Sequence, residues 1–269
     1  MFGMNRGGRP EMMQAVLTVK EKIYLTPHYI RIVLTGDVGA FRNARPGDNN
    51  KLLIPENGSR VELPDFGQRG GRNGGNRALM RTYTLRYLDL SNNLMTIDFV
   101  AHGENGPASK WAMLAKAGDE LGVLMKKKEK SLFQPAASYL IAGDHTALPV
   151  IGVILETLPP TSKGMAIIEV HSETDIQELT KPIGMDIVWK TNSLPGETSS
   201  LPGLLSTFDF SQDDWFVFVA AESQAVNEAQ AILRNSENLS RNQWQAYSYW
   251  KYGQSEESSA GARREMMNR

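Results

Sequence analysis

The pattern of apolar residues changes character near the middle of the 269-residue chain, and this change constrains the fold more than any single motif. Before it, short alternating runs such as residues 13–23 and 94–100 are separated by turn residues, a pattern typical of antiparallel strands. After it, apolar strands such as residues 138–142 alternate with helical segments such as 223–235. We therefore expect two domains, joined near Phe133-Gln134-Pro135.

The first domain is expected over residues 15–133. About six strands and one short helix, expected at residues 107–115, indicate an antiparallel six-stranded β-barrel. A segment rich in glycine and arginine, residues 57–78, is expected to be a mobile loop. Residues 1–14 are expected to form a flexible N-terminus.

The second domain is expected over residues 134–253. Alternating strands and helices indicate a parallel sheet with helices on both faces, so the fold class is a β-barrel followed by an α/β domain. The expected helices are an amphipathic one at 146–156, short ones at 175–179 and 201–208, and one at 223–235. The polar, serine- and glutamate-rich residues 254–269 are expected to form a tail.

The composition removes several classes of chemistry. The chain has no cysteine, which excludes disulfides, cysteine nucleophiles and cysteine-held iron–sulfur clusters. Its histidines, His28, His102, His145 and His171, lack ligand-type spacing, so we expect no protein-held metal site. Redox chemistry would therefore belong to a bound organic cofactor or to a metal in the substrate.

The charge and the apolar segments bear on partners and location. A formal net charge of -1 gives no reason to expect a nucleic-acid partner. The glycine- and arginine-rich residues 1–10 do not resemble a secretory signal, and no stretch has the apolar length of a membrane span. A cytoplasmic protein, monomeric by default, is the expectation.

The segment Arg81-Thr82-Tyr83-Thr84 closes the glycine-rich loop and opens an alternating run that predicts a strand. It presents a cation, two hydroxyls and an aromatic ring within four residues, which suits a flat, anionic ligand. Each residue alone has a simpler explanation: Arg81 as a surface arginine and Tyr83 as part of the barrel wall. The combination favours a ligand site.

The segment from His102 to Ser109 ends a strand and enters a helix. Gly106 permits close approach of the backbone, and Pro107 suits the first helical position. Free N–H groups and the helix dipole at such a start favour a phosphate. With Arg81 to Thr84, this segment suggests a dinucleotide with a planar ring, although the two segments alone do not distinguish FAD from FMN.

Two similar strand-to-helix segments occur in the second half, at residues 143–149 and 220–223. The first lies where dinucleotide folds bind phosphate, but it lacks the Rossmann glycine fingerprint. Asp144 and Thr146 are also good helix caps. The aromatic residues 249–253 either contribute to a site or pack over the sheet.

Four motifs in this order resemble the siderophore-interacting proteins. They are Arg-x-Tyr-Thr at 81–84, His-Gly-x-x-Gly-Pro-Ala-Ser-x-Trp at 102–111, Ala-Gly-Asp-x-Thr-Ala-Leu-Pro at 142–149 and Tyr-Trp-x-x-Gly at 249–253. The resemblance extends over residues 15–253. It implies an FAD-binding barrel followed by a pyridine-nucleotide domain, as in ferredoxin–NADP reductases. It also implies a cytoplasmic protein that uses reduced FAD to reduce ferric siderophores.

The resemblance assigns roles to residues on both domains. Arg81 and Thr84 would hold the FAD diphosphate and the flavin edge, and Tyr83 would stack on the ring. His102 and Gly103 would line the flavin, and the helix start would receive the pyrophosphate. The cofactor-binding residues that it implies are Arg81, Thr82, Tyr83, Thr84, His102, Gly103, Gly106, Pro107, Ala108, Ser109, Asp144, Thr146 and Ala147, the last three where the second domain meets the cofactor.

The resemblance further implies a basic triad that attracts anionic ferric siderophores. Lys51 matches its first position and Lys251 its last. The spacing near Lys127 departs from the usual turn, so Lys127 is the assigned middle position, with Lys126 and Lys128 as alternatives. Without the resemblance this lysine run is interpreted as a solvated turn, and with it as an electrostatic funnel.

The leading hypothesis is an FAD-dependent ferric-siderophore reductase that releases iron. The donor is expected to be NADH or NADPH, with ferredoxin as an alternative. A second hypothesis is a general NAD(P)H flavin reductase or diaphorase, and a third is a siderophore carrier without activity.

Overall fold

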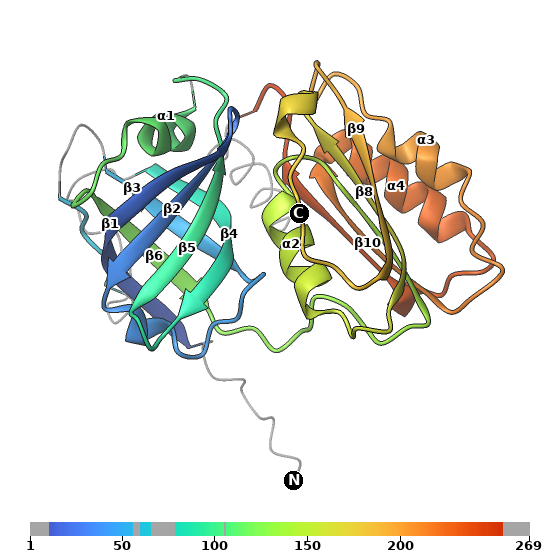
Figure 1. Ribbon diagram of the computed structural model, residues 1–269, viewed down its shortest axis with the longest axis horizontal. Coiled ribbons are helices and arrows are strands. Elements are labelled where there is room, and N and C mark those ends of the chain that lie inside the picture. Colours follow the sequence, from blue (N-terminus) through green and yellow to red (C-terminus); the bar gives the residue numbers. More distant parts are fainter. Residues whose placement is uncertain (1–10, 56–59, 66–78, 105, 255–269) are drawn as a thin grey trace, which may run out of the picture.

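The computed structural model describes residues 11–55, 60–65, 79–104 and 106–254, which form two domains side by side (Figure 1). The expectations for the first ten residues, for most of the loop at 57–78 and for nearly all of the C-terminal tail lie outside the described residues. The first domain is a barrel of strands, and the second is a sheet with helices on both faces.

The first domain is a closed antiparallel barrel in the order β1-β2-β5-β4-β3-β6. Its strands are β1 (Met12–Thr26), β2 (Tyr29–Gly36), β3 (Asn49–Ile54), β4 (Leu79–Asp89), β5 (Leu94–Val100) and β6 (Glu120–Lys126). The predicted six-stranded barrel is confirmed. β1 begins one residue before the strand expected at 13–23, and residues 12–14, expected to belong to a flexible N-terminus, are part of it because Met12 already pairs with Lys126.

Alternate side chains of these strands fill the barrel. Leu17, Ile32 and Leu52 are fully buried in one core, as period-two alternation requires. A 3-10 turn, η1 (Val38–Phe41), contributes two further buried residues. The helix α1 (Pro107–Leu114) packs against one end of the barrel, where the ring of Trp111 lies 5.7 Å from that of Phe99.

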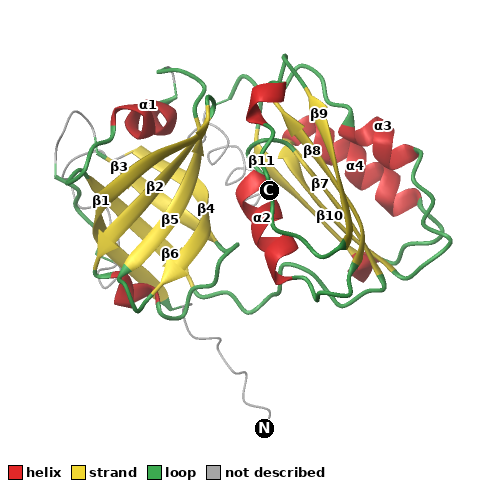
Figure 2. Ribbon diagram, in the orientation of Figure 1, coloured by secondary structure: helices red, strands yellow, loops and turns green. Residues whose placement is uncertain are grey.

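The second domain is a five-stranded parallel sheet in the order β11-β10-β7-β8-β9. Its elements are β7 (Ser138–Gly143), α2 (Leu148–Thr157), β8 (Lys163–Val170), β9 (Gly184–Thr191), α3 (Leu201–Ser206), β10 (Trp215–Glu222), α4 (Ser223–Asn235) and β11 (Trp244–Trp250), with 3-10 turns η2 (Glu173–Asp175) and η3 (Arg241–Gln243). α2 covers the face toward the barrel, and α3 and α4 cover the other (Figure 2). The predicted parallel α/β domain is confirmed.

Two expectations for the second domain are wrong. The helix at 146–156 is not amphipathic, since every residue from Leu148 to Leu155 is buried. The sheet covers one side of α2, and the barrel lies beyond the other. A helix expected at 175–179 is replaced by η2 and an irregular segment. Asp175 instead accepts hydrogen bonds from two barrel residues, from Thr26 Oγ1 at 2.8 Å and from the backbone N–H of His28 at 3.2 Å. These bonds hold this segment against the barrel.

The interface between the domains continues the core of the second domain. Tyr29 of β2 is buried in the same cluster as Ile151 and Ile154 of α2, with Leu25 and Val100 packed against it. Within the described ranges, no helix combines the length and apolarity needed to span a membrane. This buried contact places β4 beside the second domain. We call β4 the RTYT strand, after its residues Arg81-Thr82-Tyr83-Thr84.

Candidate flavin site

The predicted strand Arg81 to Thr84 is the first half of β4. Alternation places Arg81 and Tyr83 on one face and Thr82 and Thr84 on the other. Tyr83 is half-buried against the barrel core, with its ring 4.5 Å from that of Phe99. Phe99 therefore supports one side of the Tyr83 ring, as a platform for stacking requires.

Thr84 joins the barrel to the end of the second domain. It is buried, and its hydroxyl hydrogen-bonds to the Tyr249 hydroxyl at the end of β11. Burial of that phenol raises the pKa of Tyr249, and the Thr84 hydrogen bond opposes the shift. About 37% of Tyr249 remains exposed, so the hydroxyl end is enclosed while part of the ring faces solvent. The aromatic segment 249–253 thus reaches the predicted flavin edge.

The His102–Gly103 loop is fixed by a buried hydroxyl. Ser109 Oγ is fully buried, accepts from the His102 N–H at 3.0 Å and donates to the Gly103 carbonyl at 2.8 Å. The Ser109 side chain therefore shapes the loop, and a phosphate at this place would meet backbone N–H groups rather than this hydroxyl. Gly103 has φ +90°, a conformation that favours glycine.

The start of α1 keeps the geometry expected of an anion site. Pro107 occupies the first turn, and Gly106 is the extended cap residue before it. A Cβ on Gly106 would lie 2.2 Å from the His102 imidazole, so glycine allows the loop to lie flat against the helix start. The first-turn N–H groups of a helix have no acceptor within the helix.

Asn50, a polar residue near Tyr83, was not predicted from the sequence to belong to the site. Asn50 lies opposite Tyr83 in the β3–β4 register and is 1% exposed. Neither Nδ2 nor Oδ1 of this amide has a hydrogen-bond partner in the part of the chain that the structure describes, at a cost of about 1–3 kcal/mol. The sequence does hint at this site, because Asn50 is an amide on a strand face that is otherwise occupied by the apolar residues Leu52 and Ile54.

The residues at this end of β4 fit a flavin dinucleotide. They supply a cation at Arg81, an aromatic ring at Tyr83 and hydroxyls at Thr82 and Thr84. The unpaired amide of Asn50 is satisfied if a polar edge is bound nearby. This donor set matches an anionic diphosphate joined to a planar ring with polar edges.

The second-domain residues are already engaged by the chain itself. Asp144 is 5% exposed and accepts hydrogen bonds from Thr146 N–H at 2.9 Å and Trp250 Nε1 at 2.7 Å. Ala147 is fully buried, and its N–H donates to the Asp144 carbonyl at 2.9 Å. The structure thus brings Asp144 to the aromatic segment, while Ala147 packs beneath it.

The predicted basic triad comes from three elements. Lys51 Nζ donates to Thr82 Oγ1 beside Arg81. Lys51 pairs with Leu124, so Lys127, just beyond β6, is three residues farther along the neighbouring strand, an offset of about 10 Å. Lys251 is exposed and directly follows Trp250. Contacts thus link Lys51 to the RTYT strand, and Lys251 follows the segment that holds Tyr249.

The course of the lysine run is fixed by Arg45. Its Nη2 donates to the carbonyls of Lys128 and Lys130, each at 3.0 Å. The three consecutive lysines are all exposed: Lys126, Lys127 and Lys128. A run anchored through its backbone presents its charges at a fixed place on the barrel.

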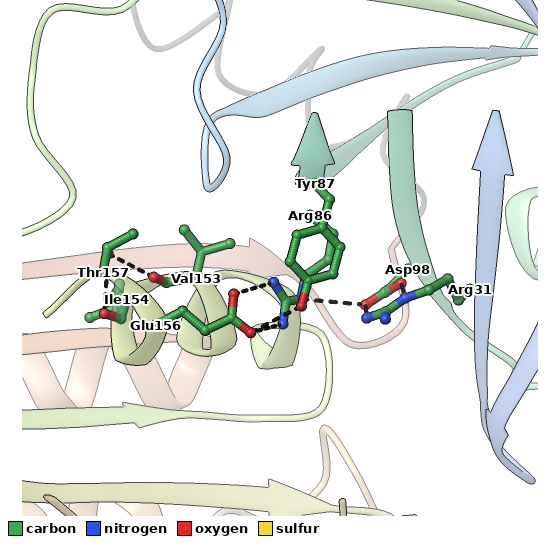
Figure 3. Close-up of polar contacts among 8 residues, drawn as sticks. All are labelled: Arg31, Arg86, Tyr87, Asp98, Val153, Ile154, Glu156 and Thr157. Carbon is green, nitrogen blue, oxygen red and sulfur yellow. Dashed lines mark hydrogen bonds and ion pairs between the residues drawn. The ribbon is translucent and has the colours of Figure 1, made fainter. Parts of the chain in front are cut away.

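A cluster of charged residues connects the two domains (Figure 3). Arg86 of β4 donates from Nη1 and Nη2 to Glu156 of α2, at 2.8 and 2.5 Å. Arg31 forms two bonds of 2.8 Å with Asp98. Tyr87 lies under the Arg86 guanidinium, 3.9 Å from ring centre to Cζ. No spacing rule in the sequence relates Arg86 to Glu156, so this contact was not predicted.

A closed antiparallel barrel followed by a parallel five-stranded α/β domain is the architecture of the ferredoxin-reductase class of flavoproteins. A ferredoxin–NADP reductase from Neisseria gonorrhoeae, solved with bound FAD and NADP, has this fold, with a TM-score of 0.57 and 12% identity over 88% of this chain and 99% of that one.

Family models identify the chain within that class. Residues 18–127 match the siderophore-interacting FAD-binding domain, and residues 136–253 match the siderophore-interacting protein domain. Ferric vibriobactin reductase ViuB of Vibrio cholerae is 31% identical over 252 residues, which cover 90% of this chain and 91% of the relative. A siderophore utilization protein from T. fusca has a TM-score of 0.80 and 30% identity over 91% of this chain and 95% of that one. The chain belongs to the siderophore-interacting protein family.

Proposed function

We propose that this protein is an FAD-dependent ferric-siderophore reductase that releases iron, with electrons from NAD(P)H or ferredoxin. The observation that carries the proposal is the RTYT strand, with Tyr83 supported by Phe99 and Thr84 in contact with Tyr249. The relative named ferric vibriobactin reductase supports the choice of substrate class.

The residues of β4 and α1 would hold FAD. Arg81 would pair with the diphosphate, Tyr83 would stack on the ring, and Thr84 would bond its edge. The start of α1 would face the pyrophosphate. When bound, FAD accepts two electrons together and passes them on singly, so one reduced flavin serves two ferric complexes.

Lys51, Lys127 and Lys251 would raise the local concentration of the iron complex. A ferric tris-catecholate is anionic because its catecholate dianions outweigh the charge of Fe(III), and lysine cations attract it over about a Debye length, 10 Å at 0.1 M salt. Reduction weakens the complex because Fe(III) prefers hard anionic oxygen ligands more strongly than Fe(II) does. No side chain is required as a nucleophile.

The test uses FAD-loaded protein reduced with stoichiometric dithionite and mixed anaerobically with a ferric catecholate. The expected result is flavin reoxidation with release of two Fe(II) per flavin to a ferrous chelator. Turnover equal to that of simple iron chelates would favour a general flavin reductase. Tight binding of the ferric siderophore by a colourless protein that cannot be reconstituted would favour a carrier.

The lysines have their own test. Lys51→Ala and Lys251→Ala should each weaken ferric-siderophore binding severalfold while FAD stays bound, with a larger effect at low salt. Lys20→Ala is the matched control, because Lys20 is an exposed lysine on β1 outside the predicted triad. Affinities unchanged in both triad variants, or lowered equally by Lys20→Ala, would exclude the triad.

A further inference from the structure

The carboxyl-end edge of the parallel sheet carries three buried carboxylates. Asp144 follows β7, Glu169 lies near the end of β8, and Glu222 ends β10. Their exposed fractions are 5%, 3% and 7%. In parallel α/β domains this edge is where ligands bind, and phosphates bind there to free N–H groups at helix starts.

Glu222 occupies the start of α4. Its Oε2 accepts from the N–H groups of Gln224 and Ala225, the donors that open this helix. Its Oε1 accepts from the N–H of Tyr252 at 3.2 Å. The helix that follows β10 therefore offers its first donors to a side chain of the same chain.

Asp144 and Glu169 act in the same way on the neighbouring loops. Asp144 binds Thr146 through Oδ1 and accepts from Glu222 N–H at 2.8 Å and from Trp250 through Oδ2. Glu169 accepts from the N–H of Ser200 at 2.6 Å and from its hydroxyl at 2.7 Å, just before α3. Pro149, in the first turn of α2, has no N–H to give.

Little space remains between these groups. The cavity that they line has a volume of about 10 Å³, room for about one water molecule. Trp250 and Gly196 also line it, and Tyr252 packs close to the same loop, since a Cβ on Gly196 would lie 2.5 Å from Tyr252 and 2.8 Å from Trp250. The Tyr252 hydroxyl also donates to Glu197 at 2.9 Å.

We propose that Asp144 and Glu222 are specificity-determining residues that prevent this edge from binding the phosphates of a pyridine nucleotide. The edge presents carboxylate acceptors where a diphosphate needs donors, and the aromatic segment fills the space. The inference rests on the proposed function insofar as NAD(P)H is a candidate donor to the flavin. It implies that any reduction by NAD(P)H occurs through the nicotinamide ring without phosphate recognition.

The test compares reductants with and without phosphates. FAD-loaded protein is mixed anaerobically with NADPH, NADH, reduced nicotinamide mononucleotide or 1-benzyl-1,4-dihydronicotinamide, and loss of oxidised-flavin absorbance is followed. Each second-order rate constant is divided by that for free FAD, which removes intrinsic reactivity. The proposal expects ratios within about tenfold of one another. A ratio for NADPH or NADH about a hundredfold above that for the phosphate-free compound would overturn it.

A charge-neutral variant gives an independent measurement. Glu222→Gln keeps an acceptor for Gln224 and Ala225 and should raise the rate constant for NADPH about tenfold, with no change for the phosphate-free compound. Glu228→Gln, the same substitution on an exposed turn of α4, should change neither. No gain with a folded Glu222→Gln protein would count against the proposal, and the reductant series decides if that variant does not fold.

Failure of this inference is distinct from failure of the proposed function. Iron release from dithionite-reduced protein involves no nucleotide, so it reports only on the reductase step. Phosphate recognition with iron release refutes the inference alone. Absence of iron release refutes the proposed function and leaves the reductant comparison to stand by itself.

Discussion

Arg86 forms an ion pair between the barrel and the second domain, and replacing it with methionine should lower the free energy of unfolding. The side chain is nearly buried, pairs in two bonds with Glu156 and lies 3.8 Å from Asp98. Methionine keeps the unbranched, apolar stem of the side chain and removes the guanidinium, whose Nη2 lies 3.0 Å from the ideal Cβ position of Gly152.

The expected loss of stability depends on which hydrogen bonds Glu156 and Asp98 retain when Arg86 is replaced. Removing one member of a buried pair costs about 3–5 kcal/mol when the other charge is left without compensation. Here the Glu156 side chain is 24% exposed and keeps the Tyr87 hydroxyl at 3.0 Å. Asp98 keeps both bonds from Arg31. We therefore expect Arg86→Met to lower the free energy of unfolding by about 2–3 kcal/mol.

Urea unfolding followed by tryptophan fluorescence measures this loss, with Arg42→Met at an exposed arginine of the barrel as the control. Glu156→Gln should cost about 1 kcal/mol, and the double variant should cost less than the sum. A loss below about 0.5 kcal/mol, the usual range for surface substitutions, or one equal to that of Arg42→Met, would refute the reasoning.

The same pair predicts a pH dependence. Burial raises the pKa of Glu156, but the hydrogen bonds and charge of Arg86 outweigh burial and hold the pKa below its ordinary value. A carboxyl with a depressed folded pKa adds stability above its unfolded pKa and loses it as pH falls through the folded pKa. The difference between wild type and Arg86→Met should therefore shrink in acid.

Two further substitutions test other parts of the interface and site. Gly103→Ala should cost about 1 kcal/mol or more, because φ +90° is strained for alanine although no atom lies within 4 Å of the new Cβ; thermal unfolding and flavin retention measure it, and an unchanged melting temperature contradicts it. Burial raises the pKa of Asp175, but hydrogen bonds from Thr26, His28 and Ser172 outweigh burial and lower the pKa. Asp175→Asn should therefore destabilise the protein at neutral pH, and progressively less as pH falls through the folded pKa of Asp175. A stability difference between wild type and variant that persists in acid contradicts this.

The architecture was predictable because strand alternation and the strand–helix rhythm are local in sequence. The expected helix at 223–235 matches α4, and the strand at 94–100 matches β5. The prediction of an amphipathic α2 failed for a tertiary reason. The run Leu148 to Leu155 is apolar on all sides, as a helix covered on both faces requires, and only the docked barrel explains the second face.

The relative placement of candidate site residues was predictable where one short segment supplies several groups. Arg81, Tyr83 and Thr84 lie on one strand, so the faces they occupy follow from alternation alone. The pair Arg86 and Glu156 is 70 residues apart in the chain, and the contact between Thr84 and Tyr249 joins β4 of the barrel to the last strand of the second domain. No periodicity carries such information.

The role of Asp144 at the sheet edge could not be settled from its sequence motif. Asp144 and Thr146 were expected both as helix caps and as cofactor neighbours, and their sequence is compatible with either role. The structure assigns both oxygens of Asp144 to partners within the chain, including Trp250 from a segment more than 100 residues away. Because Tyr249 of the same strand also contacts Thr84, β11 lies beside both the predicted flavin edge and the carboxylates at the sheet edge. From the proposed function we therefore expect an electron donor to meet β11 as it approaches the flavin, so that the position of this strand, rather than a nucleotide fingerprint, would govern access.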